Sequence, residues 1–298
     1  MKSYDISVAI PTYNRREIVL DTLKLLKKQT FKNFEVIVID QTKDNPNSFI
    51  KKLKQISDID ISYHQVQPPS LPSARNYALE VSQSSIVLFL DDDVIPEDDL
   101  IQQHIKIYQL MPDVSAVAGR VLQDGFVIKK EVLRFDKYAV SHGVFTATEP
   151  SLTNAFPGGN HSVIKNDVVK AGMYETRYYD SAFREESDLS LRMAKLNMKI
   201  YFEPKACLRH LAISSGGTRD KSNIAHLEDK LCFYKNEMFF TIRSSQDIIG
   251  SLKIKHREYC RGRGFYTNIT RTGLFFIGLM AAVYRHILGK KNVSKEVS

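Results

Sequence analysis

The sequence predicts an α/β fold with a mostly parallel central sheet flanked by helices, followed by a helical C-terminal extension. Three observations predict it. Short apolar runs, typical of strands buried on both faces of a parallel sheet, alternate with segments whose apolar residues recur at helical spacing. One such run, Ile86–Leu90, is uninterrupted and is followed by Asp91, Asp92 and Asp93. Beyond about residue 210 the alternation ends, and the remaining chain has a helical pattern.

The first half of the chain contains the clearest alternation. A strand is expected at residues 6–10, where Pro11 stops it, and Val19, Leu23 and Leu26 then recur at helical spacing. The further elements expected, in order, are a strand at 34–40, a helix at 45–55, a strand at 59–65, a Pro-rich loop at 68–72, a helix at 73–81, a strand at 86–90, a helix at 96–110 and a strand at 116–121. This order is typical of a parallel α/β sheet.

The second half is less regular. After Gln123 the pattern loosens as far as the paired glycines Gly158 and Gly159, which allow a tight turn or a close backbone approach to a ligand. A helix is expected from about residue 184, because apolar residues recur at 189, 193 and 196. A strand is expected at 199–202, leading on to His210.

Composition and charge exclude several classes of protein. With 298 residues and 43% hydrophobic residues, the chain can bury a large core. The three cysteines are widely spaced without a CxxC motif, which favours a reducing compartment, and we expect no secretory signal because the first residues run into a strand pattern. Residues 251–298 contain ten Lys/Arg and two Glu, which accounts for the whole net charge of +8. The main domain is therefore neutral, which argues against nucleic-acid binding and indicates an acidic surface as the partner of the C-terminus.

Two acidic clusters are candidates for chemistry. Three carboxylates after one strand are costly to hold together unless a cation cancels their charge, and a hard divalent cation commonly bridges nucleotide phosphates. The alternative is that Asp is simply common in turns and helix caps. The second cluster, Glu185, Glu186 and Asp188, opens the later helix, where the helix dipole alone would favour acidic residues.

Four segments in order resemble the family 2 glycosyltransferases of the Rossmann-like GT-A fold, over about residues 6 to 210. Residues 7–15 are similar to the family's opening strand and nucleotide loop, and residues 73–76 to its ARN helix. Residues 90–93 resemble its DxD metal motif, and residues 185–192 its EDxDLxxR segment. The run Gln41-Thr42-Lys43-Asp44 departs from the Asp- and Ser-rich family pattern, which leaves the base of the nucleotide less defined.

The resemblance implies a nucleotide-diphosphate sugar donor, most readily a UDP-sugar, and Mn²⁺ or Mg²⁺ as cofactor. The cation is expected on Asp93, Asp91 and His210, although a structural role for this histidine is the alternative. Asp40 would accept a hydrogen bond from the base, and Arg75 would approach the base or the phosphates. The complete set of expected donor-binding residues is Pro11, Thr12, Tyr13, Asn14, Asp40, Arg75, Asp91, Asp92, Gly159 and Arg219, the last on a Gly-rich loop that could equally be a plain surface loop.

A general base is the remaining requirement, because an acceptor hydroxyl must lose its proton as it attacks the anomeric carbon. The resemblance places this base at Glu186, where the family has Asp, and Glu185 or Asp188 are alternatives. The expected activity is an inverting transfer to a glycan or lipid-linked acceptor in cell-surface polysaccharide biosynthesis. An inactive relative that serves as a membrane-bound assembly subunit is the alternative. A sugar nucleotidyltransferase is disfavoured, because no glycine follows the first strand.

The C-terminal region, 231–298, is expected to be a basic, partly apolar helical unit after a glycosyltransferase domain at 1–230. Its apolar run at residues 274–284 is shorter than the ~20 residues that span a bilayer, and Arg271 and Arg285 flank it. A helix lying in the membrane interface fits this length and charge, so we expect a cytoplasmic protein held peripherally on the inner face of the cell membrane. The alternative is a buried helix packed on the main domain.

Overall fold

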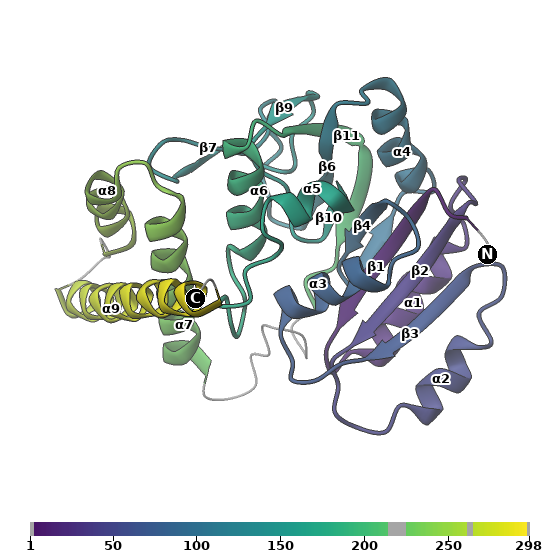
Figure 1. Ribbon diagram of the computed structural model, residues 1–298, viewed down its shortest axis with the longest axis horizontal. Coiled ribbons are helices and arrows are strands. Elements are labelled where there is room, and N and C mark those ends of the chain that lie inside the picture. Colours follow the sequence, from purple (N-terminus) through teal and green to yellow (C-terminus); the bar gives the residue numbers. More distant parts are fainter. Residues whose placement is uncertain (1–2, 214–224, 261–264, 297–298) are drawn as a thin grey trace.

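The computed structural model describes residues 3–213, 225–260 and 265–296. In this part of the chain a central sheet lies between helices, and three further helices form a separate group beside it (Figure 1). The prediction of an α/β fold with a mostly parallel sheet and a C-terminal helical extension is therefore confirmed. The expected division between domains at residue 230 stays a prediction, and it falls inside a helix, α7 (Ala225–Ser244).

The elements alternate along the chain as expected. The strands are β1 (Ile6–Thr12), β2 (Phe34–Asp40), β3 (Asp60–Gln65), β4 (Ile86–Leu90), β5 (Val94–Pro96), β6 (Val114–Leu122), β7 (Arg134–Phe135), β8 (Ser141–His142), β9 (Ser151–Thr153), β10 (Asn160–Ile164) and β11 (Lys199–His210). The helices of the main domain are α1 (Arg16–Leu26), α2 (Asn47–Leu53), α3 (Leu71–Val81), α4 (Leu100–Leu110), α5 (Lys165–Lys170) and α6 (Glu185–Lys195). The C-terminal helices are α7, α8 (Ile248–Cys260) and α9 (Phe265–Glu296).

The sheet has the strand order β3-β2-β1-β4-β10-β6-β11-β5, and β9 pairs with β11. The first four strands are parallel to one another, and β6 is parallel to β11, whereas β10 runs antiparallel between β4 and β6. Thr12 at the end of β1 lies opposite Asp40 at the end of β2, and β4 ends beside them just before Asp91. The parallel strands therefore deliver their polar carboxyl ends to one edge of the sheet.

Both faces of the sheet are buried, which explains the continuous apolar runs. Along β2, Ile37 and Ile39 belong to the apolar cluster that includes residues of α3 and α6, while Val36 and Val38 belong to the cluster that includes residues of α1 and α4. Side chains of a strand alternate between faces, so a strand covered on both sides must be apolar throughout. This packing fixes the sheet edge on which the acidic residues lie.

Three boundaries differ clearly from the sequence-based expectation. The first strand does not stop at Pro11, because β1 continues through it to Thr12, which pairs with Asp40 of β2. The helix expected from residue 96 begins only at Leu100, because Val94–Pro96 forms a short strand paired with the end of β11. Proline is tolerated there because β5 is the last strand at this edge of the sheet. The Pro-rich loop is also shorter than expected, since α3 starts at Leu71, with Pro72 in its first turn and Ser70 as its N-cap.

The C-terminal helices pack against the rest of the chain through a third apolar cluster, which joins α7, α8 and α9 to residues of α6 and of the segment between β7 and α6. The apolar run at residues 274–284 lies in α9, and Leu274, Phe275 and Ala282 are buried in this cluster. The buried-helix alternative thus holds for one face of α9. Among the described residues no helix has the length and apolar character needed to cross a membrane.

Candidate active site

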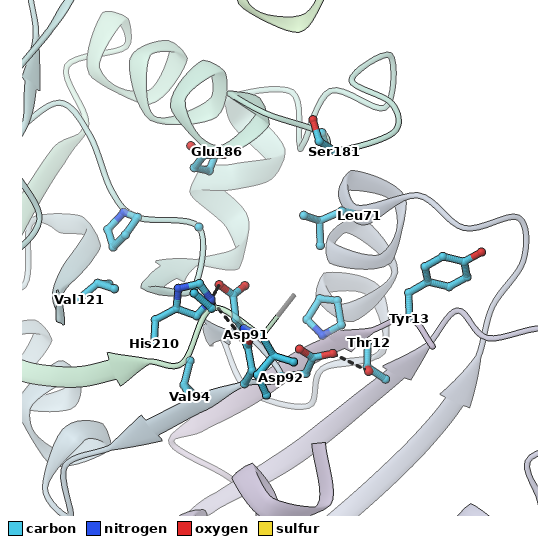
Figure 2. Close-up of a pocket in the computed structure, with 18 of the residues that line it drawn as sticks. Thr12, Tyr13, Leu71, Asp91, Asp92, Val94, Val121, Ser181, Glu186 and His210 are labelled. Atoms are coloured by element: carbon cyan, nitrogen blue, oxygen red, sulfur yellow. Dashed lines mark hydrogen bonds and ion pairs between the residues drawn. The ribbon is translucent and has the colours of Figure 1, made fainter. Parts of the chain in front are cut away.

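A cavity of about 450 Å³ opens at the carboxyl ends of the parallel strands. Its walls come from the end of β1, the three aspartates after β4, the glycine loop before β10, the start of α6 and the end of β11. Ligands of open α/β sheets bind at this position, outside the carboxyl ends of the strands. Figure 2 shows these segments converging on the cavity from different parts of the chain.

The three consecutive aspartates take different roles because the chain turns after β4. Asp92 points toward β1, where it accepts hydrogen bonds from Thr12 Oγ1 (2.7 Å) and Arg15 Nη1 (3.1 Å). Burial raises the pKa of Asp92 to about 6, against the lowering effect of these two partners. The backbone oxygen of Asp92 also accepts a hydrogen bond from Thr22 of α1 (2.7 Å). Asp92 therefore anchors the loop to β1 and α1.

Asp91 and Asp93 form a cluster with His210 at the end of β11, and each of the three offers a ligand atom within 4.8 Å of the others. His210 Nε2 lies 3.1 Å from Asp93 Oδ1 and 3.9 Å from Asp91 Oδ2. On the other side of the ring, Nδ1 lies 2.8 Å from Oε1 of Gln123, which accepts its hydrogen. With the proton on Nδ1, Nε2 is the nitrogen that can bind a cation.

The charge state of this cluster suits a divalent cation. Burial acts to raise the pKa of Asp93, but without a metal the protonated His210 donates from Nε2 to this carboxylate, and its hydrogen bond and charge, together with the Ile213 N–H and Arg15, lower the pKa below its ordinary value. A cation bound at Nε2 would replace that proton and supply the positive charge instead. Asp93 is therefore ionised, as a metal ligand must be. Two carboxylates and one imidazole are a donor set that fits Mn²⁺, and the carboxylates alone fit Mg²⁺.

The glycine loop is fitted closely around this cluster. A side chain at Gly159 would place its Cβ within 2.2 Å of Asp91 Oδ2, so only glycine leaves the carboxylate in place. The next residue, Asn160, is fully buried and donates to the backbone oxygens of Arg120 and Ala206 (2.9 Å each), which fixes the loop on β6 and β11. The close approach expected of the paired glycines is thus an approach to Asp91.

The start of α6 carries the second acidic cluster, and its members differ sharply in surroundings. Glu185 lines the cavity but is fully buried in an ion pair with Arg75, whose other nitrogen donates to Gly158 O (2.9 Å). Glu186 also lines the cavity, and in the described part of the chain no cation forms an ion pair with it. Its carboxylate accepts a hydrogen bond from Ser187 Oγ (2.9 Å). In Figure 2 Glu186 lies across the cavity from Asp91 and His210.

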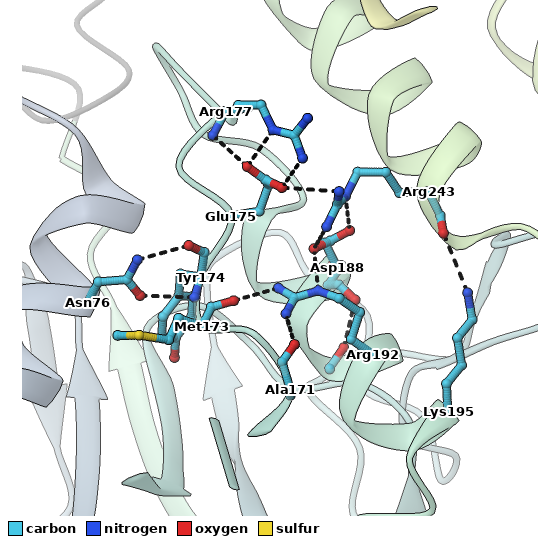
Figure 3. Close-up of polar contacts among 12 residues, drawn as sticks. Asn76, Ala171, Met173, Tyr174, Glu175, Arg177, Asp188, Arg192, Lys195 and Arg243 are labelled. Carbon is cyan, nitrogen blue, oxygen red and sulfur yellow. Dashed lines mark hydrogen bonds and ion pairs between the residues drawn. The ribbon is translucent and has the colours of Figure 1, made fainter. Parts of the chain in front are cut away.

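Asp188 does not line the cavity. It is buried and accepts hydrogen bonds from Arg243 of α7 (2.8 Å to Oδ1) and Arg192 of α6 (2.8 Å to Oδ2). Figure 3 shows how these arginines continue the network, since Arg243 also pairs with Glu175 and Arg192 donates to the backbone oxygen of Met173. Asp188 therefore joins α6 to the C-terminal helices.

The residues expected around the nucleotide are only partly brought together. Pro11, Thr12 and Tyr13 line the cavity. Asp40 does not line it, because it is completely buried and accepts hydrogen bonds from Arg16 Nε (2.6 Å) and Tyr63 Oη (2.8 Å).

Of the other residues expected to bind the donor, some line the cavity and others do not. Asn14 is not among the lining residues, and its backbone N–H donates to Thr42 Oγ1 (2.9 Å). Arg75 lines the cavity but already pairs with Glu185. Arg219 lies outside the described residues.

Several lining residues were not singled out as site residues from the sequence. Gln41 lines the cavity directly after Asp40, and Gln123 orients His210. Arg15 bridges Asp92 and Asp93, with Nη1 at 3.1 Å and 3.3 Å from their carboxylates. Three adjacent carboxylates need a positive charge nearby. The pair Arg15-Arg16 after the first strand could therefore have predicted that Arg15 is a counter-ion. No sequence signal marks Gln123 or the aromatic lining residues Phe126 and Phe183.

A family model and a curated relative both identify the chain as similar to glycosyltransferases. The model of "Glycosyl transferase family 2" matches residues 7–168. The amylovoran biosynthesis glycosyltransferase AmsB of Erwinia amylovora is 22% identical over 232 residues, which cover 74% of this chain and 74% of that protein. The family match extends from β1 to α5 and includes the three aspartates after β4.

Solved structures show the same fold at low sequence identity. The mannosyltransferase PcManGT of Pyrobaculum calidifontis, in complex with GDP-Man and Mn²⁺, superposes with a TM-score of 0.58 at 15% identity, covering 97% of this chain and 76% of that one. The 1–349 fragment of S. aureus TarS in complex with UDP-GlcNAc superposes with a TM-score of 0.59 at 15% identity, covering 92% of this chain and 81% of that one. These likenesses extend the shared fold into the C-terminal helices.

Proposed function

The chain belongs to glycosyltransferase family 2, and on this basis we propose that it is an inverting glycosyltransferase that uses a nucleotide-diphosphate sugar. The acceptor would be a hydroxyl of a glycan or a lipid-linked sugar in cell-surface polysaccharide biosynthesis. One observation carries the proposal. Glu186 is a carboxylate without an ion-pair partner among the described residues, and it faces the Asp91–Asp93–His210 cluster across one cavity.

The cation cluster would hold Mn²⁺ or Mg²⁺ at the diphosphate. When bound, the cation neutralises charge on the departing nucleotide diphosphate as a Lewis acid. The Gln123 hydrogen bond keeps the imidazole of His210 oriented for this role, and Gly159 leaves space for Asp91. Arg15 already balances the charge of Asp92 and Asp93 and so keeps the carboxylates together.

Glu186 is the proposed general base. It would accept the proton of the acceptor hydroxyl as the oxygen attacks the anomeric carbon on the face opposite the leaving group, and a single displacement of this kind inverts the centre. Glu185 and Asp188 are poor candidates for the same step, because each is buried and paired with arginine. They would instead hold the start of α6 in position.

The donor is proposed to be a UDP-sugar, bound with its base against Pro11, Thr12 and Tyr13 beside Gln41. The likeness to a TarS structure that contains UDP-GlcNAc supports this choice, whereas PcManGT contains GDP-Man. The name of AmsB, a biosynthesis glycosyltransferase for amylovoran, supports a role in polysaccharide assembly. We further propose that the protein binds peripherally to the cytoplasmic face of the cell membrane, where it would reach lipid-linked acceptors.

Substitution of Glu186 tests the proposed base directly. Glu186→Gln keeps the size of the side chain but cannot accept the proton, so sugar transfer should fall by about 10²–10⁴-fold while nucleotide binding with Mn²⁺ is unchanged. Glu80→Gln, an exposed glutamate on α3, is the matched control and should keep full activity. Unchanged transfer by Glu186→Gln would contradict the assignment. Proton NMR of the first-formed product should show an inverted anomeric centre.

A further inference from the structure

Helix α9 has an outer face that is strongly apolar and uncovered in the described part of the chain. Its large side chains there are 41% to 74% exposed, and they recur at helical spacing over about 18 Å of helix. The residues of this outer face are Phe276, Ile277, Met280, Val283, Tyr284, Ile287 and Leu288. So many large apolar side chains exposed on one helix are unusual for a protein surface and mark an interaction site.

The opposite face of α9 is fixed, so the outer face cannot turn inward. Gly278 lies so close to α7 that a side chain there would meet the backbone of Tyr234 at 2.8 Å. Arg285 is buried, donates to Asn236 Oδ1 (2.9 Å) and to the backbone oxygen of Arg177 (3.0 Å), and lies over the ring of Tyr179. Arg285, expected from the sequence to flank the apolar run as a lipid-facing cation, is therefore a packing residue instead.

Basic residues accompany the outer face. Of the ten Lys/Arg in residues 251–298, Lys255 is buried in an ion pair with Glu237, and Arg285 is buried and donates to Asn236. Eight Lys/Arg remain against two Glu. Lys253 and Arg257 are exposed on α8, which packs beside α9, and the ring of His256 between them contacts Phe275 and Phe276 of α9. An apolar face bordered by cations complements a surface that is apolar inside and negatively charged outside.

We propose that the outer face of α9 binds an anionic lipid surface, with the helix axis parallel to the membrane plane. Because its inner face is packed on α7, the helix can offer only one side, and contact would stop at the headgroup and acyl boundary. Figure 1 shows α9 (yellow) at the edge of the molecule, where it crosses α7 in the group of C-terminal helices. This inference adds a membrane partner to the proposed function. It rests on that function only where it says that the enzyme meets its lipid-linked acceptors at the membrane.

A second copy of the chain is the competing occupant, and charge disfavours it. Pairing two outer faces would bring together two regions in each of which eight Lys/Arg stand against two Glu. Like charges at an interface raise its free energy, whereas an anionic bilayer attracts both regions.

Vesicle flotation tests the inference without requiring turnover. The full-length protein should float with vesicles of phosphatidylcholine and phosphatidylglycerol, and at least about tenfold less with phosphatidylcholine alone. Ile277→Glu/Met280→Glu should reduce flotation at least about tenfold, because two charges enter the apolar face. Lys253→Glu/Arg257→Glu should also reduce it, and its loss should be largest at low ionic strength.

The matched control is Leu110→Glu/Val169→Glu, which places the same charges on exposed apolar positions of α4 and α5. This control should float like the natural sequence. Equal flotation of the α9 variant and this control would overturn the inference. So would a protein that does not float but forms dimers that Ile277→Glu/Met280→Glu dissociates.

Nucleotide binding, measured on the same variants, should be unchanged, because none of the substituted positions lines the cavity. Failure of the catalytic proposal would instead appear as unchanged transfer by Glu186→Gln. The two proposals can therefore fail separately.

Discussion

Removing the charge of Glu237 should destabilise the protein strongly, because this carboxylate neutralises two buried cations. Glu237 of α7 is fully buried, accepts a hydrogen bond from Arg184 Nε (2.7 Å), and pairs with Lys255 of α8, which is 1% exposed. Arg184 is the residue directly before α6, so this triad ties α6 to the C-terminal helices. Removing one partner of a buried ion pair typically lowers the free energy of unfolding by about 3–5 kcal/mol, because the other charge stays buried without a partner.

The pKa of Glu237 gives a second measure of the same interaction. Burial acts to raise it, but the charges of Arg184 and Lys255 outweigh burial and lower the pKa from 4.5 to about 2. At about 1.4 kcal/mol per pKa unit, the ionised carboxylate stabilises the fold by roughly 3 kcal/mol. Since the folded-state pKa is lowered, this contribution is complete above about pH 4.5 and is lost as the pH falls toward 2.

Thermal and urea unfolding of Glu237→Gln test this reasoning. At neutral pH the variant should lose about 3–5 kcal/mol, or roughly 6–20 °C in melting temperature. The difference from the natural sequence should shrink as the pH is lowered from 5 toward 3. Glu17→Gln, which breaks the exposed pair with Lys52, is the control and should change stability by less than about 1 kcal/mol. Equal stability of Glu237→Gln and the natural sequence, or a difference that does not depend on pH, would refute the account.

The other predictions concern the cation cluster. Gly159→Ala should displace Asp91 and weaken nucleotide binding with Mn²⁺ by about tenfold or more, as measured by calorimetry. Gln123→Ala should weaken Mn²⁺ binding by about 10–100-fold, because His210 loses the partner that orients its ring, while the melting temperature without metal should be nearly unchanged. Removal of divalent cations by EDTA should abolish sugar transfer in a radiolabel assay, and added Mn²⁺ should restore it; full activity in EDTA would contradict a metal-dependent reaction.

The sheet and the acidic edge were predictable because their signals are local. A strand buried on both faces must be apolar along its length, so Ile86–Leu90 and Phe34–Asp40 could be recognised without knowing their neighbours. The start of α6 was equally clear from its helical periodicity. The helix start at residue 96 was misplaced because the pairing of Val94–Pro96 with β11 involves residues more than 100 positions later.

The roles within the acidic helix could not be read from the sequence alone. Glu185, Glu186 and Asp188 are equivalent in type, and they differ only in the arginines that reach them from elsewhere. Arg243, the partner of Asp188, lies 55 residues further along the chain. The same holds for Asp40, expected from the sequence near a nucleotide base, which accepts hydrogen bonds from Arg16 and Tyr63 of neighbouring elements. Long-range pairing of buried charges therefore decides which carboxylate is available for chemistry.

Calorimetric titration with UDP, GDP and dTDP, each with and without Mn²⁺, tests the central claim most directly. The account predicts that one nucleotide, expected to be UDP, binds at least about tenfold more tightly with Mn²⁺, and that Asp93→Asn abolishes this difference. Binding of the same strength with and without the metal, or no binding of any of the three, would contradict a nucleotide–cation site at Asp91, Asp93 and His210.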